Sequence, residues 1–369
     1  MSHSFTSILI VAGGTGGHIS PGLSLAEESL QRNIQVTFLS IPRNRNYSGF
    51  VNTHFQMEWY EAPALQKNLR SLLLFIPKFI ISIFKAAKLL QKTKIRSVIV
   101  LGGYPSMPAA IAAILLRRQL FVCEQNAVHG KVTRILSRFA KLVFLTFEPI
   151  TENQNTANFV VTGNPIRQNL KNKANSTKSR SRQLPKKPTI LVLGGSQGAV
   201  QINEMIFDYW SRFTIEAQKL NWIVQAGEKL FQDFQLKIDS SLPTKLKKQI
   251  TIFGFDADIY RYFEKADLCF SRAGAGNITE SAVFGLPMIL LPYPFAADNH
   301  QLANAKAAVK AGAAVLIDRK DTNSEELKVA LRKVIDITSY KNMSESSLRL
   351  GRADASIRVL NEIQSFFGN

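Results

Sequence analysis

The chain has 369 residues, 46% of them hydrophobic and 20% charged, which predicts about two to three globular domains with a buried core. Its two cysteines, Cys123 and Cys269, exclude a disulfide framework. Both lie in or beside apolar runs, as expected of buried thiols in a reducing compartment. The formal net charge of +19 indicates an anionic partner, namely nucleic acid, anionic lipid or a phosphorylated substrate. Residues 1–7 lack a basic segment followed by an apolar one, so we expect no secretory signal.

The first predicted strand, residues 8–12, leads through a glycine turn into a helix predicted over residues 21–32. The turn consists of Gly13, Gly14, Thr15, Gly16, Gly17 and His18. Such a strand–turn–helix places unpaired N–H groups and the positive end of a helix dipole together, which suits a diphosphate. Because a helix N-terminus disfavours imidazolium, we expect a neutral His18 that can accept a proton. The alternative is a histidine that only hydrogen-bonds the loop.

Strands and helices then alternate through the first half of the chain. Strands are expected over residues 34–39, 97–101, 120–123, 142–145 and 159–162, and helices over residues 107–116 and 131–139. The hydrophobic residues within 42–61 follow no regular spacing, so we expect no helix or strand there. The alternation predicts a parallel, doubly wound sheet, in which ligands bind at the carboxyl ends of the strands.

The stretch from Leu69 to Phe84 is apolar almost all round, and we expect Pro77 and Lys78 to interrupt it. It is shorter than the ~18–20 residues that span a bilayer. The bases that flank it are Lys67, Arg70, Lys85 and Lys88. An apolar segment bracketed by bases fits a surface lying on an anionic membrane, and a partly buried core helix is the alternative.

Residues 169–188 are expected to be a basic linker, because residues 171–187 contain seven Lys or Arg and no Asp or Glu. After the linker, strand 189–193, a second glycine turn and a helix from about residue 200 repeat the opening pattern. The repeat predicts two similar α/β domains that face a cleft. We expect the domains to cover residues 1–168 and 189–345, with a C-terminal helix in residues 346–369 packing back toward the first domain.

Further strands in the second half are expected over residues 222–225, 250–253, 268–270, 288–291 and 314–317. Helices are expected over residues 242–249, 259–265, 278–284, 299–311 and 353–367. Glu280 follows a small-residue turn and could accept two ribose hydroxyls, although capping of its helix is the alternative. Gln301 and Asn304 are three residues apart and share a face, as polar groups addressing a sugar would. Asp256 and Asp258 match an Asp-x-Asp metal motif, but they precede a helix, where Asp is a good N-cap. We expect no metal and no other cofactor.

Three other functions are disfavoured by the motifs. A dinucleotide fold would need glycine at Ile19 and an acidic residue after Leu39, and neither is present. A Walker A loop would need Gly-Lys-Ser/Thr after a turn. A nucleic-acid-binding protein would carry a basic stripe with interleaved aromatic residues, so we expect no nucleic-acid partner.

Seven motifs, in order from about residue 8 to residue 320, resemble those of the MurG-type family, the bacterial peptidoglycan enzymes that add N-acetylglucosamine to lipid I. They are Gly13-Gly14-Thr15-Gly16-Gly17-His18, Gly102-Gly103-Tyr104, Glu124-Gln125-Asn126, Gly163-Asn164-Pro165-Ile166-Arg167, Gly194-Gly195-Ser196-Gln197-Gly198, Ser271-Arg272-Ala273-Gly274-Ala275 with Glu280, and Asp298-x-x-Gln301-x-x-Asn304. The resemblance implies an inverting glycosyltransferase of the GT-B fold with two Rossmann-like domains. It also implies UDP-N-acetylglucosamine as donor, lipid I as acceptor, lipid II as product, and a peripheral position on the cytoplasmic face of the bacterial inner membrane. A UDP-sugar epimerase of the same fold is the rival.

Site roles follow from the same resemblance. His18 is the candidate base on the muramoyl 4-hydroxyl, and Glu124 is the second candidate. The implied donor-binding residues are Thr15, Gly16, Gly17, Asn126, Arg167, Ser196, Gln197, Asp256, Ala275, Gly276, Asn277, Ile278, Thr279, Glu280 and Gln301. The implied acceptor-binding residues are Gly13, Gly14, Gly102, Gly103, Tyr104 and Asn304. The chain departs from the family pattern at Cys123, where the family has His, at Thr133, where it has Asn, and in residues 65–70, which lack the glycine-rich acceptor loop.

Overall fold

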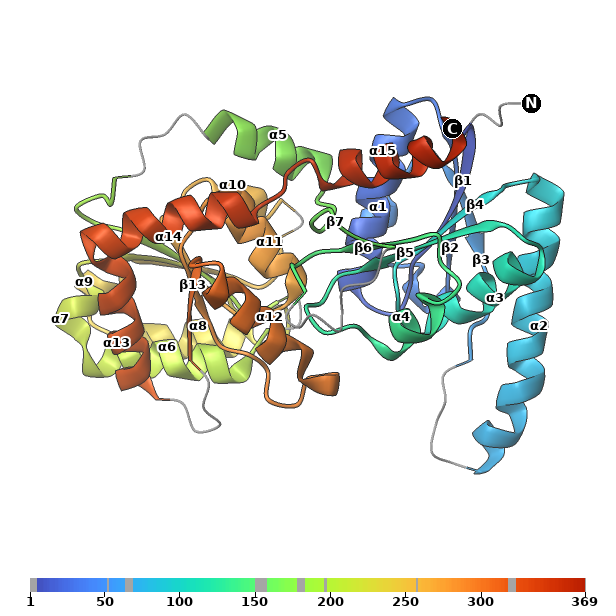
Figure 1. The fold of residues 1–369 in the computed structure, drawn as a ribbon. Coiled ribbons are helices and arrows are strands. Elements are labelled where there is room, and N and C mark those ends of the chain that lie inside the picture. Colours follow the sequence, from blue (N-terminus) through green and yellow to red (C-terminus); the bar gives the residue numbers. More distant parts are fainter. Residues whose placement is uncertain are drawn as a thin grey trace. The chain divides into compact units, whose positions relative to one another are not determined.

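The computed structural model describes residues 5–51, 53–63, 69–149, 158–177, 183–195, 198–256, 258–317 and 323–368 (Figure 1). The chain forms two compact units. Unit 1 comprises Met1–Gln168 and Ala353–Asn369, and unit 2 comprises Asn169–Arg352. Each unit is a parallel α/β structure, so the predicted fold class is confirmed.

Unit 1 is built on a seven-stranded parallel sheet in the order β3-β2-β1-β4-β5-β6-β7. Its strands are β1 (Ser7–Val11), β2 (Gln35–Ser40), β3 (Gln56–Trp59), β4 (Ser97–Val100), β5 (Gln119–Glu124), β6 (Leu142–Leu145) and β7 (Phe159–Val161). Strand order reverses between β1 and β4, which makes the carboxyl end of β1 the topological switch point. The glycine turn that carries His18 begins there. β3 lies in the stretch where no regular element was expected.

Helices cover both faces of this sheet. They are α1 (Gly16–Gln31), α2 (Leu69–Thr93), α3 (Met107–Leu115), α4 (Lys131–Leu136) and α15 (Ala355–Gly368), with short 3₁₀ turns at Pro42–Asn44, Ser48–Phe50 and Tyr104–Ser106. Alternate residues of β1 point to opposite cores: Ile8 and Ile10 pack with α1 and α15, whereas Leu9 and Val11 pack with α2 and α3. This explains why β1 is apolar without interruption.

The C-terminal helix α15 packs on α1 (Figure 1). Arg32, just after α1, donates from Nη1 to Asn361 Oδ1 at 2.8 Å and to Gln364 Oε1 at 3.0 Å. The rings of Phe5 and Phe367 stack with centroids 5.5 Å apart. The last helix of the chain therefore completes the core of unit 1.

Helix α2 is a single helix of 25 residues that passes through Pro77, so the expected interruption is wrong. One proline removes one N–H donor, and the buried contacts of Ala86 and Leu90 hold the helix to the sheet. Within the described residues, no helix is both long enough and apolar enough to cross a membrane.

Unit 2 has a six-stranded parallel sheet in the order β10-β9-β8-β11-β12-β13. Its strands are β8 (Thr189–Leu193), β9 (Asn221–Gln225), β10 (Ile250–Phe253), β11 (Leu268–Ser271), β12 (Met288–Leu290) and β13 (Ala314–Leu316). β8 occupies the position that β1 has in unit 1. It pairs in parallel with β9 on one side and β11 on the other, and the second glycine turn follows it. The internal repeat seen in the sequence is thus a repeat of the switch point.

Six helices of unit 2 differ from expectation. The helices of this unit are α5 (Gln168–Thr177), α6 (Val200–Arg212), α7 (Thr214–Ala217), α8 (Phe231–Ser241), α9 (Thr244–Lys247), α10 (Tyr260–Phe263), α11 (Ala275–Val283), α12 (His300–Lys310), α13 (Ser324–Ile335) and α14 (Ile337–Leu350). α5 falls in the stretch expected as linker, and its Lys173 pairs with Glu264 at 3.1 Å. α7, α8, α13 and α14 were not expected, and the helix expected over residues 242–249 is reduced to the four residues of α9.

Candidate active site

The glycine turn after β1 is held by the segment that follows β2. Gly14 has a φ of +94°, a conformation that favours glycine. Its N–H donates to Asn44 Oδ1 at 3.0 Å, and its carbonyl accepts from Arg43 Nη2 at 3.1 Å. Gly13 is buried beneath the turn. The exposed residues at the start of α1 are Thr15, Gly16 and Gly17. Their backbone N–H groups can bind an anion.

The imidazole of His18 is held on two sides. Nδ1 lies 2.9 Å from Oε1 of Gln125, a buried residue directly after β5. The turn after β4 contacts the ring, since a Cβ would lie 3.6 Å from Cε1 if built at Gly102 and 3.3 Å from Nε2 if built at Gly103. These glycines have φ values of +78° and +71°, so alanine at either would be strained, and alanine at Gly103 would also crowd the ring. Among the described residues none hydrogen-bonds Nε2, which leaves that nitrogen for a ligand.

Glu124 organises the loop that follows β5. Its Oε1 accepts from the backbone N–H of Asn126 at 3.0 Å and from that side chain's Nδ2 at 3.3 Å. Its Oε2 accepts from the Gly130 N–H at 2.9 Å and from the hydroxyl of Thr133. The side chain is 4% exposed. With both oxygens engaged and buried, Glu124 suits a structural role better than proton transfer.

The structure brings Arg167 to the first turn of α1. Its Nη2 donates to the Tyr47 hydroxyl at 3.3 Å, and the Tyr47 ring packs where a Cβ on Gly16 would meet it at 3.4 Å. The guanidinium therefore adds a positive charge beside the exposed N–H groups. Tyr104 is half-buried at the start of the 3₁₀ turn after Gly103, and Asn126 is half-buried on the Glu124 loop.

His129 lies in the same loop and is 8% exposed, with its ring edge-on to Phe159 at a centroid distance of 5.0 Å. Burial lowers the pKa of His129; Glu124 opposes this and Arg134 adds to it. Below the ordinary histidine pKa of about 6.5, the unfolded chain therefore binds more protons at this site than the folded chain does.

We accordingly expect the free energy of unfolding to fall as pH drops from 7 to 5.5, with a contribution from His129 of up to about 1.4 kcal/mol per pH unit. Urea unfolding of His129→Gln should show a flatter dependence on pH than the parent protein shows. His54→Gln, which changes an exposed histidine, is the matched control. Equal slopes in all three proteins would contradict the prediction.

The second glycine turn, after β8, requires glycine for steric reasons. A Cβ at Gly194 would lie 2.7 Å from the backbone nitrogen of Ala199, and one at Gly198 would lie 2.3 Å from the carbonyl oxygen of Ala226. Gly195 and Gly198 also have positive φ, +83° and +77°. The predicted phosphate residues Ser196 and Gln197 lie outside the described residues.

Helix α11 presents one face to the core and another to the surface of unit 2. Ile278 and Thr279 are buried, and the Thr279 hydroxyl donates to the Ala275 carbonyl at 2.5 Å. Only the backbone of these residues is available to a ligand. Gly276 and Glu280, four residues apart, share the half-buried face. The structure therefore aligns Glu280 with the first turn of α11.

Arg272 follows β11, and its side chain hydrogen-bonds the residues that follow β12. Its Nη1 donates to the carbonyls of Leu291 and Pro292, each at 3.2 Å, and its Nη2 donates to Gln201 Oε1 at 2.9 Å. Burial lowers the pKa of Arg272, and the neighbouring Tyr293 opposes this. The Arg272 carbonyl accepts from Asn277 Nδ2 at 3.3 Å, which fixes the side chain of that predicted donor residue.

A pocket of about 760 Å³ opens beside the second glycine turn. Its lining includes Gly194, Gly198, Gln201, Arg272, Tyr293 and Gln301. Gln301 Oε1 accepts from the Tyr293 N–H at 2.8 Å, which orients the amide nitrogen of Gln301 for donation. The pocket thus joins two features that were predicted separately, the turn and the glutamine of α12.

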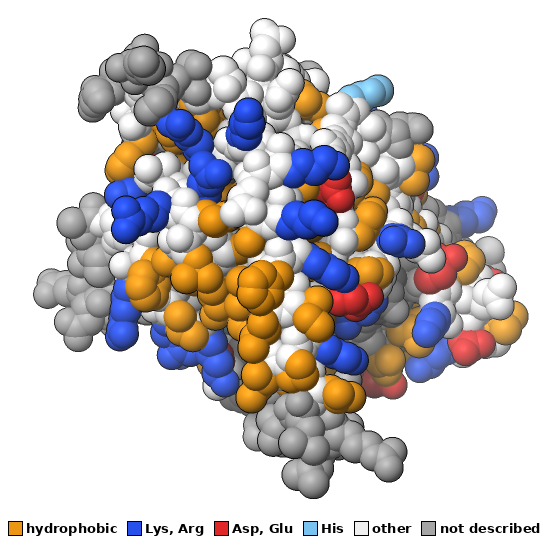
Figure 2. Space-filling model, turned by 90° about the vertical axis from the view of Figure 1, so that its right-hand side faces the viewer, with side chains coloured by type: hydrophobic (Ala, Val, Ile, Leu, Met, Phe, Trp, Pro, Cys, Tyr) orange, Lys and Arg blue, Asp and Glu red, His pale blue; other side chains and the backbone are white. Residues whose placement is uncertain are grey.

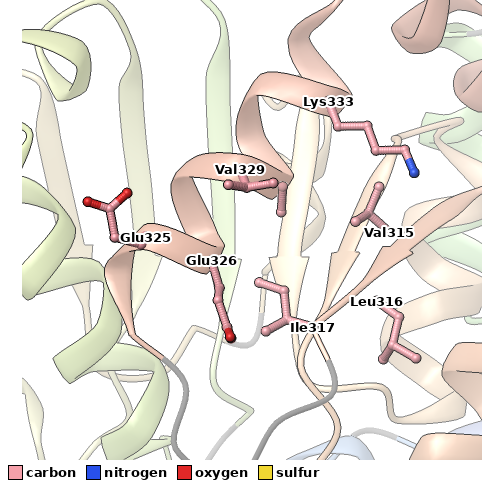
Figure 3. A pocket seen from close by; sticks show the side chains of 8 residues that line it. Val315, Leu316, Ile317, Glu325, Glu326, Val329 and Lys333 are labelled. Atoms are coloured by element: carbon pink, nitrogen blue, oxygen red, sulfur yellow. The ribbon is translucent and has the colours of Figure 1, made fainter.

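A second pocket in unit 2, of about 480 Å³, lies between the end of the sheet and α13 (Figure 3). Val315, Leu316 and Ile317 line it from the strand, and Glu325, Glu326, Val329 and Lys333 line it from the helix (Figure 3). Glu325 pairs with Lys328 at 3.6 Å. It shares no lining residue with the predicted site, and we do not include it.

The side chains of Asn304 and Asp256, both predicted to bind a substrate, hydrogen-bond to other groups of the protein. Asn304 is 0% exposed, and its Nδ2 donates to the Ala273 carbonyl at 3.1 Å. The Asn304 side chain thus supports the turn before α11, and its contact with the acceptor stays a prediction. Asp256 accepts from the Asp258 N–H at 2.8 Å and pairs with Arg261. Burial acts to raise the pKa of Asp256, but these hydrogen bonds and one from Tyr262 outweigh it, so the pKa is lowered.

Two parallel α/β units, each with a glycine turn at its switch point, have the architecture of the GT-B fold. Residues 8–145 match the model of the glycosyltransferase family 28 N-terminal domain, and residues 189–359 match the family 28 C-terminal domain. The chain belongs to glycosyltransferase family 28.

Relatives over nearly the whole chain carry one name, UDP-N-acetylglucosamine–N-acetylmuramyl-(pentapeptide) pyrophosphoryl-undecaprenol N-acetylglucosamine transferase. The protein of that name from Leptospira interrogans is 34% identical over 358 residues, which is 95% of this chain and 96% of the relative. That from Caldicellulosiruptor saccharolyticus is 32% identical over 366 residues, 97% of each chain.

Among solved structures, MurG from Acinetobacter baumannii is similar with a TM-score of 0.75 at 25% identity, covering 98% of this chain and 99% of that one. A UDP-N-acetylglucosamine 2-epimerase is similar with a TM-score of 0.67 at 17% identity, covering 98% of this chain and 97% of that one. The second likeness shows the fold alone.

Proposed function

We propose that this chain transfers N-acetylglucosamine from UDP-N-acetylglucosamine to the muramoyl 4-hydroxyl of lipid I, with inversion at the anomeric carbon, and so forms lipid II for peptidoglycan synthesis. The relatives' shared name supports the substrates. The observation that carries the chemistry is the clamped imidazole of His18, whose Nε2 is left available at the exposed start of α1.

The proposed reaction is a single displacement. His18 Nε2 removes the proton of the acceptor hydroxyl as its oxygen attacks the anomeric carbon. The bond from that carbon to the diphosphate breaks, and UDP leaves with the electron pair. Arg167 and backbone N–H groups at helix N-termini stabilise the developing negative charge. Inversion follows because the nucleophile and the leaving group occupy opposite faces of the carbon.

We assign the donor to unit 2. Glu280 accepts the ribose hydroxyls, Gln301 binds the sugar hydroxyls, the first turn of α11 and Ser196 bind the diphosphate, and the backbone near Asp256 holds uracil. The pocket beside the second glycine turn supports the assignment of Gln301. The acceptor diphosphate is assigned to the turn of Gly13 and Gly14 with Gly103 and Tyr104, in unit 1.

The anomeric configuration of the product tests the displacement. The donor carries the sugar in the α configuration, so a single displacement gives a β linkage. The proton coupling at the new anomeric centre, measured by NMR on product made from lipid I analogue, should report β. An α linkage would contradict the inverting mechanism while leaving the substrate assignment intact.

We also propose that α2 binds an anionic membrane surface, which places the protein peripherally at the cytoplasmic face of the inner membrane. Ile76, Ile80 and Phe84, spaced by four residues, are 65%, 45% and 70% exposed, whereas Ala86 and Leu90 are buried. Figure 2 shows this face of the molecule, where hydrophobic side chains gather and Lys and Arg side chains border them. Apolar side chains bordered by bases suit an interface with anionic lipid. Lys67 and the Arg70 side chain lie outside what the structure describes.

Reversing the charges of Lys78, Lys85 and Lys88, which are exposed on α2, should release the protein from anionic vesicles. Each base near such a surface contributes about 1 kcal/mol, so affinity should fall at least about 100-fold. The matched control reverses Lys245, Lys248 and Lys310, exposed lysines of unit 2, and makes the same change in net charge. Vesicle co-sedimentation that responds equally to both triple variants would show that only bulk charge matters.

A further inference from the structure

Gln125 connects the base to the backbone of the sheet. Its side chain is 4% exposed and makes two hydrogen bonds: Nε2 donates to the Cys123 carbonyl at 3.2 Å, and Oε1 lies 2.9 Å from His18 Nδ1. A carbonyl oxygen can only accept, so the amide nitrogen of Gln125 must face Cys123. The amide oxygen is thereby left facing His18.

This order of donors and acceptors determines which nitrogen of His18 carries the proton. The amide oxygen of Gln125 only accepts, so the hydrogen of the neutral imidazole must reside on Nδ1. Nε2 then has a lone pair. In the other tautomer two lone pairs would face each other at 2.9 Å, and Nε2 would carry a hydrogen that prevents it from accepting a proton.

The imidazole has little freedom to escape this arrangement by rotating. Gly103 approaches its other edge so closely that a Cβ there would lie 3.3 Å from Nε2 and Cδ2, and Gly102 lies beside Cε1, 3.6 Å from where its Cβ would be. Ser106 Oγ donates to the Gly102 carbonyl at 2.6 Å and holds that turn in place. The ring is therefore fixed both in tautomer and in direction.

We propose that Gln125 is a positioning residue that holds His18 in the Nδ1–H tautomer with Nε2 free to accept the acceptor's proton. The proposal rests on the proposed function of His18 as the base. Gln125 itself touches no reacting atom; it acts through the imidazole. The sequence indicates none of this, because 107 residues separate the two side chains.

Steady-state kinetics of Gln125→Met test the role, since methionine keeps the length of the side chain and removes the acceptor. At saturating donor and acceptor we expect kcat to fall about 10²-fold, within the range that a general base supplies, with both KM values nearly unchanged. Gln125→Glu keeps an acceptor toward Nδ1 and loses the donor to Cys123, and should retain more kcat than Gln125→Met. Gln119→Met, the same change at the other end of β5, is the matched control and should leave kcat unchanged.

The decisive comparison adds Gln125→Met to His18→Ala. If Gln125 acts only through His18, the double variant should be no slower than His18→Ala alone. A further loss of equal size in the double variant would overturn the proposal, as would wild-type kcat in Gln125→Met.

A spectroscopic measurement separates this proposal from the proposed function. In protein labelled with ¹⁵N-histidine at a pH where the imidazole is neutral, the His18 signals are those absent from His18→Ala. We expect a protonated Nδ1 and an unprotonated Nε2 in the wild type, and a mixture of tautomers in Gln125→Met. A proton on Nε2 in the wild type would overturn the proposal even if transfer activity is present. Protonated Nδ1 in a protein with no activity on lipid I would reject the proposed function and leave the positioning intact.

Discussion

His18→Ala is expected to lower kcat for transfer to a lipid I analogue by about 10²–10⁴-fold, because the variant lacks the group that accepts the hydroxyl proton. The KM for UDP-N-acetylglucosamine should change less than kcat, since Glu280 and Gln301, the residues proposed to bind the ribose and the sugar, lie in unit 2. Initial rates at saturating donor and acceptor measure the effect. His54→Ala removes an exposed histidine and should have no effect.

A near-wild-type kcat in His18→Ala would contradict the assignment of the base. The remaining candidate would then be Glu124, whose carboxylate accepts hydrogen bonds from Asn126, Gly130 and Thr133. We instead expect Glu124→Gln to lower the melting temperature, because an amide has one acceptor oxygen where the carboxylate has two. Loss of kcat in Glu124→Gln without loss of stability would therefore favour Glu124 as the base.

Glu280→Ala is expected to raise the KM for UDP-N-acetylglucosamine by about 10²-fold or more. Two hydrogen bonds from ribose hydroxyls to a carboxylate are involved, and hydrogen bonds to charged groups contribute about 1.5–3 kcal/mol each. The effect should be largest on binding, so isothermal titration with UDP alone should show the same loss. Glu345→Ala, which removes an exposed carboxylate from α14 in the same unit, is the matched control.

Unchanged UDP affinity in Glu280→Ala would contradict the ribose assignment. Capping of α11 does not replace that assignment, because the first turn of α11 carries no acidic residue and Glu280 lies in the later half of the helix.

The fold class was predictable because each strand of the two sheets is a short apolar run followed by a glycine or polar turn. β1 and β8 show this most clearly. β3 was missed because its residues, Gln56–Trp59, are only partly buried at the edge of the sheet and show no alternation. For α2 the sequence predicted a break that is absent. Pro77 is a helix breaker by propensity, but packing of the following turns keeps the helix continuous.

The sequence could predict candidate site residues only where the chemistry of one side chain and its position suggest a role. His18 was predicted because a helix N-terminus disfavours imidazolium, which leaves a neutral ring able to accept a proton. Gln125 and Thr133 were not assigned roles, because their function lies in contacts with His18 and Glu124 that only the fold creates. The spacing of Gln301 and Asn304 predicts a shared face, but it did not predict that Asn304 is buried and donates to the Ala273 carbonyl.

The central claim, transfer to lipid I, is tested most directly by incubating the protein with radiolabelled UDP-N-acetylglucosamine and a lipid I analogue. We predict label in a disaccharide-lipid product and release of UDP in equal amount, both dependent on the acceptor. UDP release without acceptor, or conversion of the donor to its C2 epimer with no lipid product, would contradict the account.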